Sequence, residues 1–146
     1  MTSKQVSVFL ENRPGALTEL WKVLEEENIN VRAMCLAEAE DFGVLRLMAD
    51  DPYNVTTKLQ DRSYVCKLTN VLTVEIDDKP GALVKTFEKL SDAGVNINYS
   101  YAFLSKKANK AYLVIRVSHT KEALSKLEGA DVKIICQDEI SELFDE

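Results

Sequence analysis

The sequence predicts an α+β protein made of two tandem βαββαβ domains, at residues 1–69 and 70–146, and two observations support this prediction. The first is an internal repeat, since ENRPGALTELWKVLEEENINV at residues 11–31 returns without a gap as DDKPGALVKTFEKLSDAGVNI at residues 77–97, an offset of 66 residues (77 minus 11). The second is the spacing of apolar residues, which changes in each copy from every second residue to every third or fourth and back again. This pattern indicates one folding unit present twice.

Each half is predicted to open with a strand that leads into an amphipathic helix. Apolar side chains alternate over residues 6–10 and 72–76, which is the period of a strand covered on one face. After each Pro-Gly pair, the apolar residues recur at the spacing of one helix face. These positions are Leu17, Leu20, Trp21 and Leu24 in the first copy and Leu83, Phe87 and Leu90 in the second. The helices are predicted to end near Asn28 and Gly94, since either residue tolerates a positive φ.

The remainder of each half is predicted to hold two strands, a short helix and a final strand. Alternation resumes in the second copy at positions expected to share the core face of one strand, namely Val95, Ile97, Tyr99, Tyr101 and Phe103. Further strands are expected near residues 44–49, 64–68, 111–117 and 132–136, and short helices near residues 52–60 and 120–127. With the helices on one face of an antiparallel sheet, each half becomes a ferredoxin-like sandwich, and the boundary falls near Thr69.

Composition and charge narrow the class of function. A hydrophobic fraction of 46% is enough for a packed core, and a net charge of −6 disfavours a nucleic-acid partner. The first residues lack the features of a signal peptide and no apolar run is long enough to span a membrane, so we expect a cytoplasmic protein without a membrane partner. Cys35, Cys66 and Cys136 are odd in number and far apart, which predicts buried reduced thiols and no metal site.

The Pro-Gly loop between the first strand and the first helix is the candidate ligand site in each half. Proline suits the first helical turn, and glycine lets another group approach the backbone closely. If Pro14 is the first helical residue, Arg13 is a poor N-cap, and the following amides stay partly unsatisfied unless Asn12 folds back onto them. A carboxylate can bind these amides, while Asn12, or Asp78 in the second copy, can accept from an ammonium group. Both ends of a free amino acid are thereby matched.

These loops, NRPGAL at residues 12–17 and DKPGAL at residues 78–83, resemble the motif of the ACT domain family, and so do the segments ENINV and GVNI before each second strand. The resemblance covers essentially the whole chain as a tandem pair. It implies that the loops and the second-strand starts of neighbouring domains clasp an amino-acid effector, or a similar small carboxylate, at their interface. By this resemblance the ligand-binding residues are Asn12, Arg13, Pro14, Gly15, Ala16, Leu17 and Asn30 in the first half and Asp78, Lys79, Pro80, Gly81, Ala82, Leu83, Asn96 and Ile97 in the second.

The chain also departs from the family's pattern. The first half has Glu27 and Asn28 where a glycine-containing turn is usual, so the two sites need not be equivalent. Family members are often joined to an enzyme, whereas no nucleophile–base pair, metal cluster or cofactor loop is legible here, and His119 is expected at the surface. We therefore expect no catalytic residue and no cofactor, and a small enzyme is the least favoured class of function.

An apolar surface in the first half predicts self-association. Phe9, Met34 and Leu36 are expected to point away from the helices, which leaves an uncovered sheet face. A second copy of the chain would cover it, so we expect a homodimer.

Two functions from different classes follow. The leading hypothesis is an allosteric regulatory protein that binds a free amino acid at the two loops. The alternative is an interaction module that needs no ligand and regulates an enzyme of amino-acid biosynthesis in trans.

Overall fold

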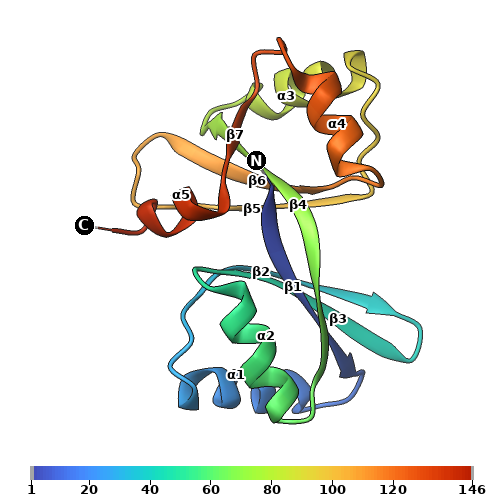
Figure 1. Ribbon diagram of the computed structural model, residues 1–146, viewed down its shortest axis with the longest axis vertical. Coiled ribbons are helices and arrows are strands. Elements are labelled where there is room, and N and C mark those ends of the chain that lie inside the picture. The colour runs from blue at the N-terminus through green and yellow to red at the C-terminus, as the bar shows by residue number, and fades with distance from the viewer. Residues whose placement is uncertain (1, 146) are drawn as a thin grey trace. The chain divides into compact units, whose positions relative to one another are not determined.

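The computed structural model describes residues 2–145, which form two compact units, each an α+β arrangement of strands and helices (Figure 1). The N-terminal unit comprises residues 4–69, and the C-terminal unit comprises residues 70–145 together with residues 2–3. Each unit has the βαββαβ order and the antiparallel pairing predicted from the sequence.

The N-terminal unit has a sheet in the order β2-β3-β1-β4, in which β3 pairs antiparallel with both β1 and β2. Its elements are β1 (Ser3–Glu11), α1 (Ala16–Glu26), β2 (Val31–Ala39), β3 (Phe42–Ala49), α2 (Pro52–Asp61) and the first part of β4 (Val65–Asp77). Strand β2 is therefore an edge strand of this unit's sheet.

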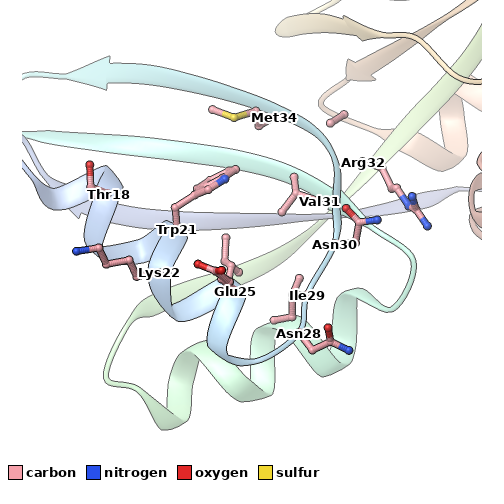
Figure 2. A pocket seen from close by; sticks show the side chains of 12 residues that line it. Thr18, Trp21, Lys22, Glu25, Asn28, Ile29, Asn30, Val31, Arg32 and Met34 are labelled. Atoms are coloured by element: carbon pink, nitrogen blue, oxygen red, sulfur yellow. The ribbon is translucent and has the colours of Figure 1, made fainter.

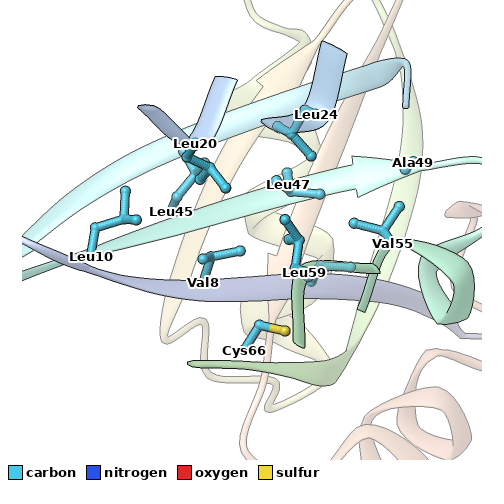
Figure 3. Packing of buried hydrophobic residues seen from close by; sticks show 11 residues of the cluster. Val8, Leu10, Leu20, Leu24, Leu45, Leu47, Ala49, Val55, Leu59 and Cys66 are labelled. Carbon is cyan, nitrogen blue, oxygen red and sulfur yellow. The ribbon is translucent and has the colours of Figure 1, made fainter. Parts of the chain in front are cut away.

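The core of the N-terminal unit lies between its sheet and its two helices (Figure 3). Leu20 and Leu24 of α1 pack with Leu59 of α2 against β-strand residues such as Leu45 and Leu47, and all of these side chains are buried. Burying five such side chains removes a large apolar area from water, which is the main stabilising contribution to a unit of this size.

The C-terminal unit has strand order β7-β4-β6-β5. Its elements are the rest of β4, α3 (Ala82–Asp92), β5 (Tyr99–Phe103), β6 (Lys110–Arg116), α4 (Thr120–Leu127), β7 (Lys133–Ile135) and α5 (Gln137–Glu142). The first residues of the chain belong here because the Ser3 hydroxyl donates to the Ile135 carbonyl at 3.3 Å and accepts from the Thr73 hydroxyl at 3.1 Å.

One strand, β4, replaces two predicted strands. The sequence indicated a strand near residues 64–68 and another at 72–76, whereas β4 runs without interruption from Val65 to Asp77. The residues at the junction, Thr69, Asn70 and Val71, include two β-branched side chains and neither Gly nor Pro, so nothing there favours a turn.

The aromatic face of β5 differs from the prediction. Tyr101 and Phe103 pair with Val114 and Tyr112, which alternate with the core residue Leu113 and so lie on the sheet face away from α3 and α4. The prediction that these aromatics share a face with Val95 and Ile97 was wrong, because the chain is irregular over residues 95–98 and β5 begins only at Tyr99.

A helix that was not predicted, α5, follows β7 and lies against this second face. The ring of Phe103 stacks on Tyr112 at 5.2 Å and on Phe144, just after α5, at 6.1 Å. Ile140 of α5 is fully buried. Helices α3 and α4 thus cover one face of the C-terminal sheet, as predicted. Helix α5 adds a short layer on the other face.

Met34 and Leu36 do not point away from the helices, which corrects the predicted bare sheet face. Met34 pairs with Leu47 and Leu36 pairs with Leu45, so both lie on the helix-covered side, at the open edge of the sheet. The cause is a register irregularity between Val31 and Ala33, which inserts one residue and reverses the alternation that follows. Of the three predicted residues, Phe9 alone lies on the far face, opposite Val44.

None of the helices within residues 2–145 has both the length and the apolar character that crossing a membrane requires.

Candidate functional site

The Pro-Gly loops of the two units have the same backbone geometry. Gly15 has φ 86° and ψ −15°, and the Ala16 amide donates to the Arg13 carbonyl at 3.4 Å. Gly81 has φ 90° and ψ −15°, and the corresponding bond joins Ala82 to Lys79 at 3.3 Å. These are the angles of a type II turn, with proline at its second position and glycine at its third. The glycine is needed because a side chain disfavours a positive φ.

The turn places the helix start later than the sequence indicated. Helices α1 and α3 begin at Ala16 and Ala82, with Gly15 and Gly81 as N-caps, so Pro14 is not the first helical residue and Arg13 is not the cap. No side chain caps either helix within the described chain. The Ala16 and Ala82 amides donate to the carbonyls of Arg13 and Lys79, and no side chain among the described residues accepts from the next amides of either first turn.

A cavity of about 220 Å³ lies beside the first loop. Four predicted site residues line it, namely Asn12, Arg13, Ala16 and Leu17. The other lining residues are Leu10, Glu11, Leu36, Ala37, Glu38 and Gly43. Pro14 and Gly15 shape the turn beside this cavity but are not among its lining residues.

The guanidinium of Arg13 is held by two carboxylates at the edge of this cavity. It donates to Glu19 through Nη2 at 2.8 Å and Nη1 at 3.3 Å, and to Glu11 through Nε at 2.7 Å. The hydrogen bonds to Glu19 and then to Glu11 raise the pKa of Arg13 above its usual range, and the bond from Arg13 lowers the pKa of Glu19. Arg13 therefore has its charge already matched within the protein.

Sequence reasoning missed the contribution of β2 and β3 to this cavity. Leu36 and Glu38 lie two residues apart on β2 and both face the loop, and Gly43 of β3 pairs with Glu38. The alternation of Met34, Leu36 and Glu38 was the available signal, but the irregularity after Val31 assigned it to the wrong face.

Asn30 lies away from the first loop. It lines a larger open groove of about 730 Å³ between α1 and β2, together with Trp21 and Met34 (Figure 2). Trp21 of α1 and Met34 of β2 remain 36% and 43% exposed, so the groove has apolar walls open to solvent. The structure thus separates Asn30 from the other predicted residues of the N-terminal unit.

The second loop has the same backbone but different charges around it. The Lys110 ammonium donates to the Asp77 carboxylate at 2.6 Å, and Lys79 is only loosely paired with the same carboxylate at 4.0 Å. The position equivalent to Glu19 is Lys85, a reversal of charge. Residues 78–81 and Leu83 are exposed and Ala82 is buried.

The other predicted residues of the C-terminal unit are dispersed. Asn96 lines a separate cavity of about 270 Å³ with His119, Glu122 and Lys126, and Ile97 packs against the core. Asn96 and the second loop do not line the same cavity. His119 is exposed, as predicted.

The cysteines are free, but only Cys66 is buried, where desolvation raises the pKa of its thiol. Cys35 and Cys136 are half-buried, so the prediction of three buried thiols was partly wrong. Within residues 2–145 no cluster of three His, Cys, Asp or Glu side chains is placed to hold a metal ion.

The fold and the doubled loop define a tandem pair of domains of one type, and comparison with family models identifies that type. Residues 1–144 match the family described as an ACT domain pair. The chain belongs to this family, and the match covers both units. No functionally curated protein matches the sequence.

Among solved structures, the chain is similar to protein BT0572 from Bacteroides thetaiotaomicron, with 38% identity and a TM-score of 0.87 over 98% of each chain. It also shares the fold of the ligand-free regulatory subunit of aspartate kinase from Thermus thermophilus, at 16% identity and a TM-score of 0.62 over 88% of this chain and 92% of that one. The corresponding subunit from Thermus flavus has 15% identity and a TM-score of 0.54, covering 87% and 91%. What the comparisons detect in this chain is an ACT domain pair.

Proposed function

We propose that this protein is a non-catalytic regulator that binds a free amino acid in the cavity beside the first loop. One observation carries the proposal: a helix start without a side-chain cap adjoins a cavity that also has an amide side chain, a carboxylate and apolar walls. Few ligands need an anion site, a cation site and an apolar surface within so small a volume.

Each end of the amino acid has a matching group. The carboxylate accepts from the amides at the start of α1, where the helix dipole favours negative charge. The ammonium donates to Asn12 or Glu38, which line the same cavity. Arg13 takes a supporting role in this proposal, because its guanidinium is already bound by Glu11 and Glu19.

A second site at residues 78–83, with Asn96 and Ile97 from the segment before β5, is part of the same proposal. The identical turn supports it. Lys85 in place of Glu19 changes the electrostatics around the turn, so the second loop is expected to differ from the first in affinity and ligand preference.

Ligand-dependent stabilisation tests the proposal. Thermal unfolding is measured for dialysed protein with each proteinogenic amino acid, since a ligand at 100 times its Kd adds roughly 2.7 kcal/mol to the free energy of unfolding. Asn12→Leu and its counterpart 66 residues later, Asp78→Leu, serve as matched variants. Loss of the shift in Asn12→Leu alone supports the first loop as the site, and the absence of any shift for the wild type contradicts amino-acid binding.

We further propose that the protein is a cytoplasmic homodimer joined at β2 and α1. Support comes from the open edge of β2 and from the exposed apolar side chains of Trp21 and Met34 beside it. Free thiols suit a reducing compartment. Light scattering after size exclusion is expected to give twice the chain mass for the wild type and for Tyr53→Glu on α2, and the monomer mass for Trp21→Glu. A wild-type monomer at micromolar concentration contradicts this proposal.

The same groove favours a second candidate function, regulation of an amino-acid metabolic enzyme in trans through protein contact alone. A groove of about 730 Å³ with an exposed tryptophan suits a protein partner. No amino-acid shift, combined with a monomeric wild type, would favour this candidate over a sensor.

A further inference from the structure

We infer that the cavity beside the first loop selects an amino acid with an uncharged aliphatic side chain, and that Leu36 and Glu38 of β2 set this choice. The inference rests on the proposed function, because it assumes that an amino acid occupies this cavity. It adds the class of side chain and two residues that the sequence motif does not contain.

The first step is the charge available to a ligand. Arg13 is bound by Glu11 at 2.7 Å and by Glu19 at 2.8 Å, so these three groups neutralise one another in part and already have partners. Glu38 also lines the cavity, and among the described residues it makes no ion pair. One carboxylate thus remains for one cation, and the ligand's α-ammonium is that cation.

The charged residues that line the cavity disfavour an amino-acid ligand with a charged side chain. An acidic side chain needs a cation, and the lining cation Arg13 would have to leave two carboxylates to provide it. A basic side chain needs a carboxylate beyond Glu38, and Glu11 is committed to Arg13. Because Glu11, Arg13 and Glu38 are exposed, solvent weakens this preference, and the apolar wall contributes the larger part of the selectivity.

The second step is the apolar wall. Leu10 from β1, Leu17 from α1 and Leu36 from β2 all line the cavity, so three elements present aliphatic side chains to one space. Leu36 is 50% exposed and has apolar area left to bury when a ligand enters. Aliphatic ligand groups gain free energy against such a wall in proportion to the area they bury.

The third step is the floor of the cavity at Gly43. A methyl group added there would lie 3.5 Å from Cδ1 of Leu36, an ordinary contact distance. Gly43→Ala can therefore reduce the space next to Leu36 without a steric clash. The effect of this substitution on binding therefore indicates whether the ligand's side chain needs the space next to Leu36.

The experiment compares leucine, alanine, lysine, aspartate and N-acetyl-leucine by calorimetric titration and thermal shift. Leucine is expected to bind most tightly to the wild type, with lysine and aspartate at least about tenfold weaker. N-acetyl-leucine lacks the ammonium and is expected to bind more weakly than leucine, and Glu38→Gln is expected to weaken leucine binding by about two- to fivefold, because Glu38 is exposed. Gly43→Ala is expected to weaken leucine more than alanine.

Leu36→Asn is the central variant, and Leu104→Asn, at a 64% exposed position of the other unit, is its matched control. Loss of leucine binding in Leu36→Asn with retention in Leu104→Asn supports the inference. If lysine or aspartate binds most tightly and Leu36→Asn removes that binding, the side-chain class is wrong while the proposed function stands. If no amino acid binds the wild type, both fail.

Discussion

Gly15 and Gly81 show how a single residue fixes the geometry of a loop. Both have φ near 90°, and a Cβ added at either position would meet no atom within 4 Å. The requirement for glycine at these positions is therefore a backbone requirement and not a packing one.

We predict that Gly15→Ala and Gly81→Ala each lower the free energy of unfolding by about 1 to 2 kcal/mol, because alanine must adopt a left-handed conformation. Gly15→Asn is expected to cost less, since asparagine tolerates that region. Urea denaturation measures the differences. Equal stability of Gly15→Ala and the wild type would show that the turn relaxes to another type.

At this scale the sequence predicted part of the candidate site. Asn12 and Leu17, which line the cavity beside the first loop, were named from the contiguous motif. Leu36 and Glu38 line the same cavity and were missed, because their face depends on a strand irregularity that no residue type signals. Pro14 was misplaced by two positions, since proline suits both the first helical position and the second position of a type II turn.

The elements of the C-terminal unit are held by interactions outside the repeat. The carboxylate of Glu75 on β4 is almost fully buried and accepts from Tyr112 at 3.0 Å, Lys107 at 3.2 Å and Lys133 at 3.3 Å. Burial by itself would raise the pKa of Glu75, but these hydrogen bonds outweigh it and the pKa lies below its ordinary value. Strands β6 and β7 and the loop before β6 are thus tied to one carboxylate.

We predict that Glu75→Gln destabilises the protein by about 1 to 3 kcal/mol at pH 7. Because the folded pKa is depressed, the stabilisation is present above the ordinary carboxyl pKa of about 4.3 and is lost as pH falls through the folded pKa. The difference in the free energy of unfolding between Glu75→Gln and the wild type, measured by urea denaturation, should therefore become smaller below about pH 4.3. Glu122 is an exposed helix carboxylate, so Glu122→Gln is the control and should change the free energy of unfolding little.

Helix α5 is stabilised by its tertiary contacts. Six residues are too few for a helix to be stable by propensity alone, and the fully buried side chain of Ile140 contributes the packing of this helix. The repeat did not predict α5, because it lies beyond the duplicated segment and its short length gives no clear periodicity.

We predict that Ile140→Ala lowers the free energy of unfolding by about 2 to 5 kcal/mol through lost burial and a new cavity. Leu104→Ala, at an exposed position, should change it little. Thermal and urea unfolding measure both variants. A small effect of Ile140→Ala would mean that α5 can detach without loss of the fold.

The whole chain passes from one unit to the other inside a strand. The repeat and its periodicity predicted two βαββαβ units and their strand order in sequence, because these follow from patterns long enough to be distinctive. They did not predict that β4 is continuous, since two adjoining strands and one long strand share the same residue preferences.

We predict that limited trypsin digestion cuts first in the turn around Lys106 and Lys107, and not after Lys67 within β4. A residue in a hydrogen-bonded strand resists the extended binding that a protease needs. Mass spectrometry of the first fragments identifies the cut. An early cut after Lys67 would show that the junction behaves as a flexible linker.

The matching turns at Gly15 and Gly81 have a consequence for how such a protein can change over time. Main-chain angles hold each loop in place, so the side chains around it can be exchanged without rebuilding the fold, as Glu19 and Lys85 already differ. Under the proposed function, duplication leaves one loop free to acquire a new ligand while the other keeps the old one. A chain of this design could then respond to two metabolites without gaining a domain.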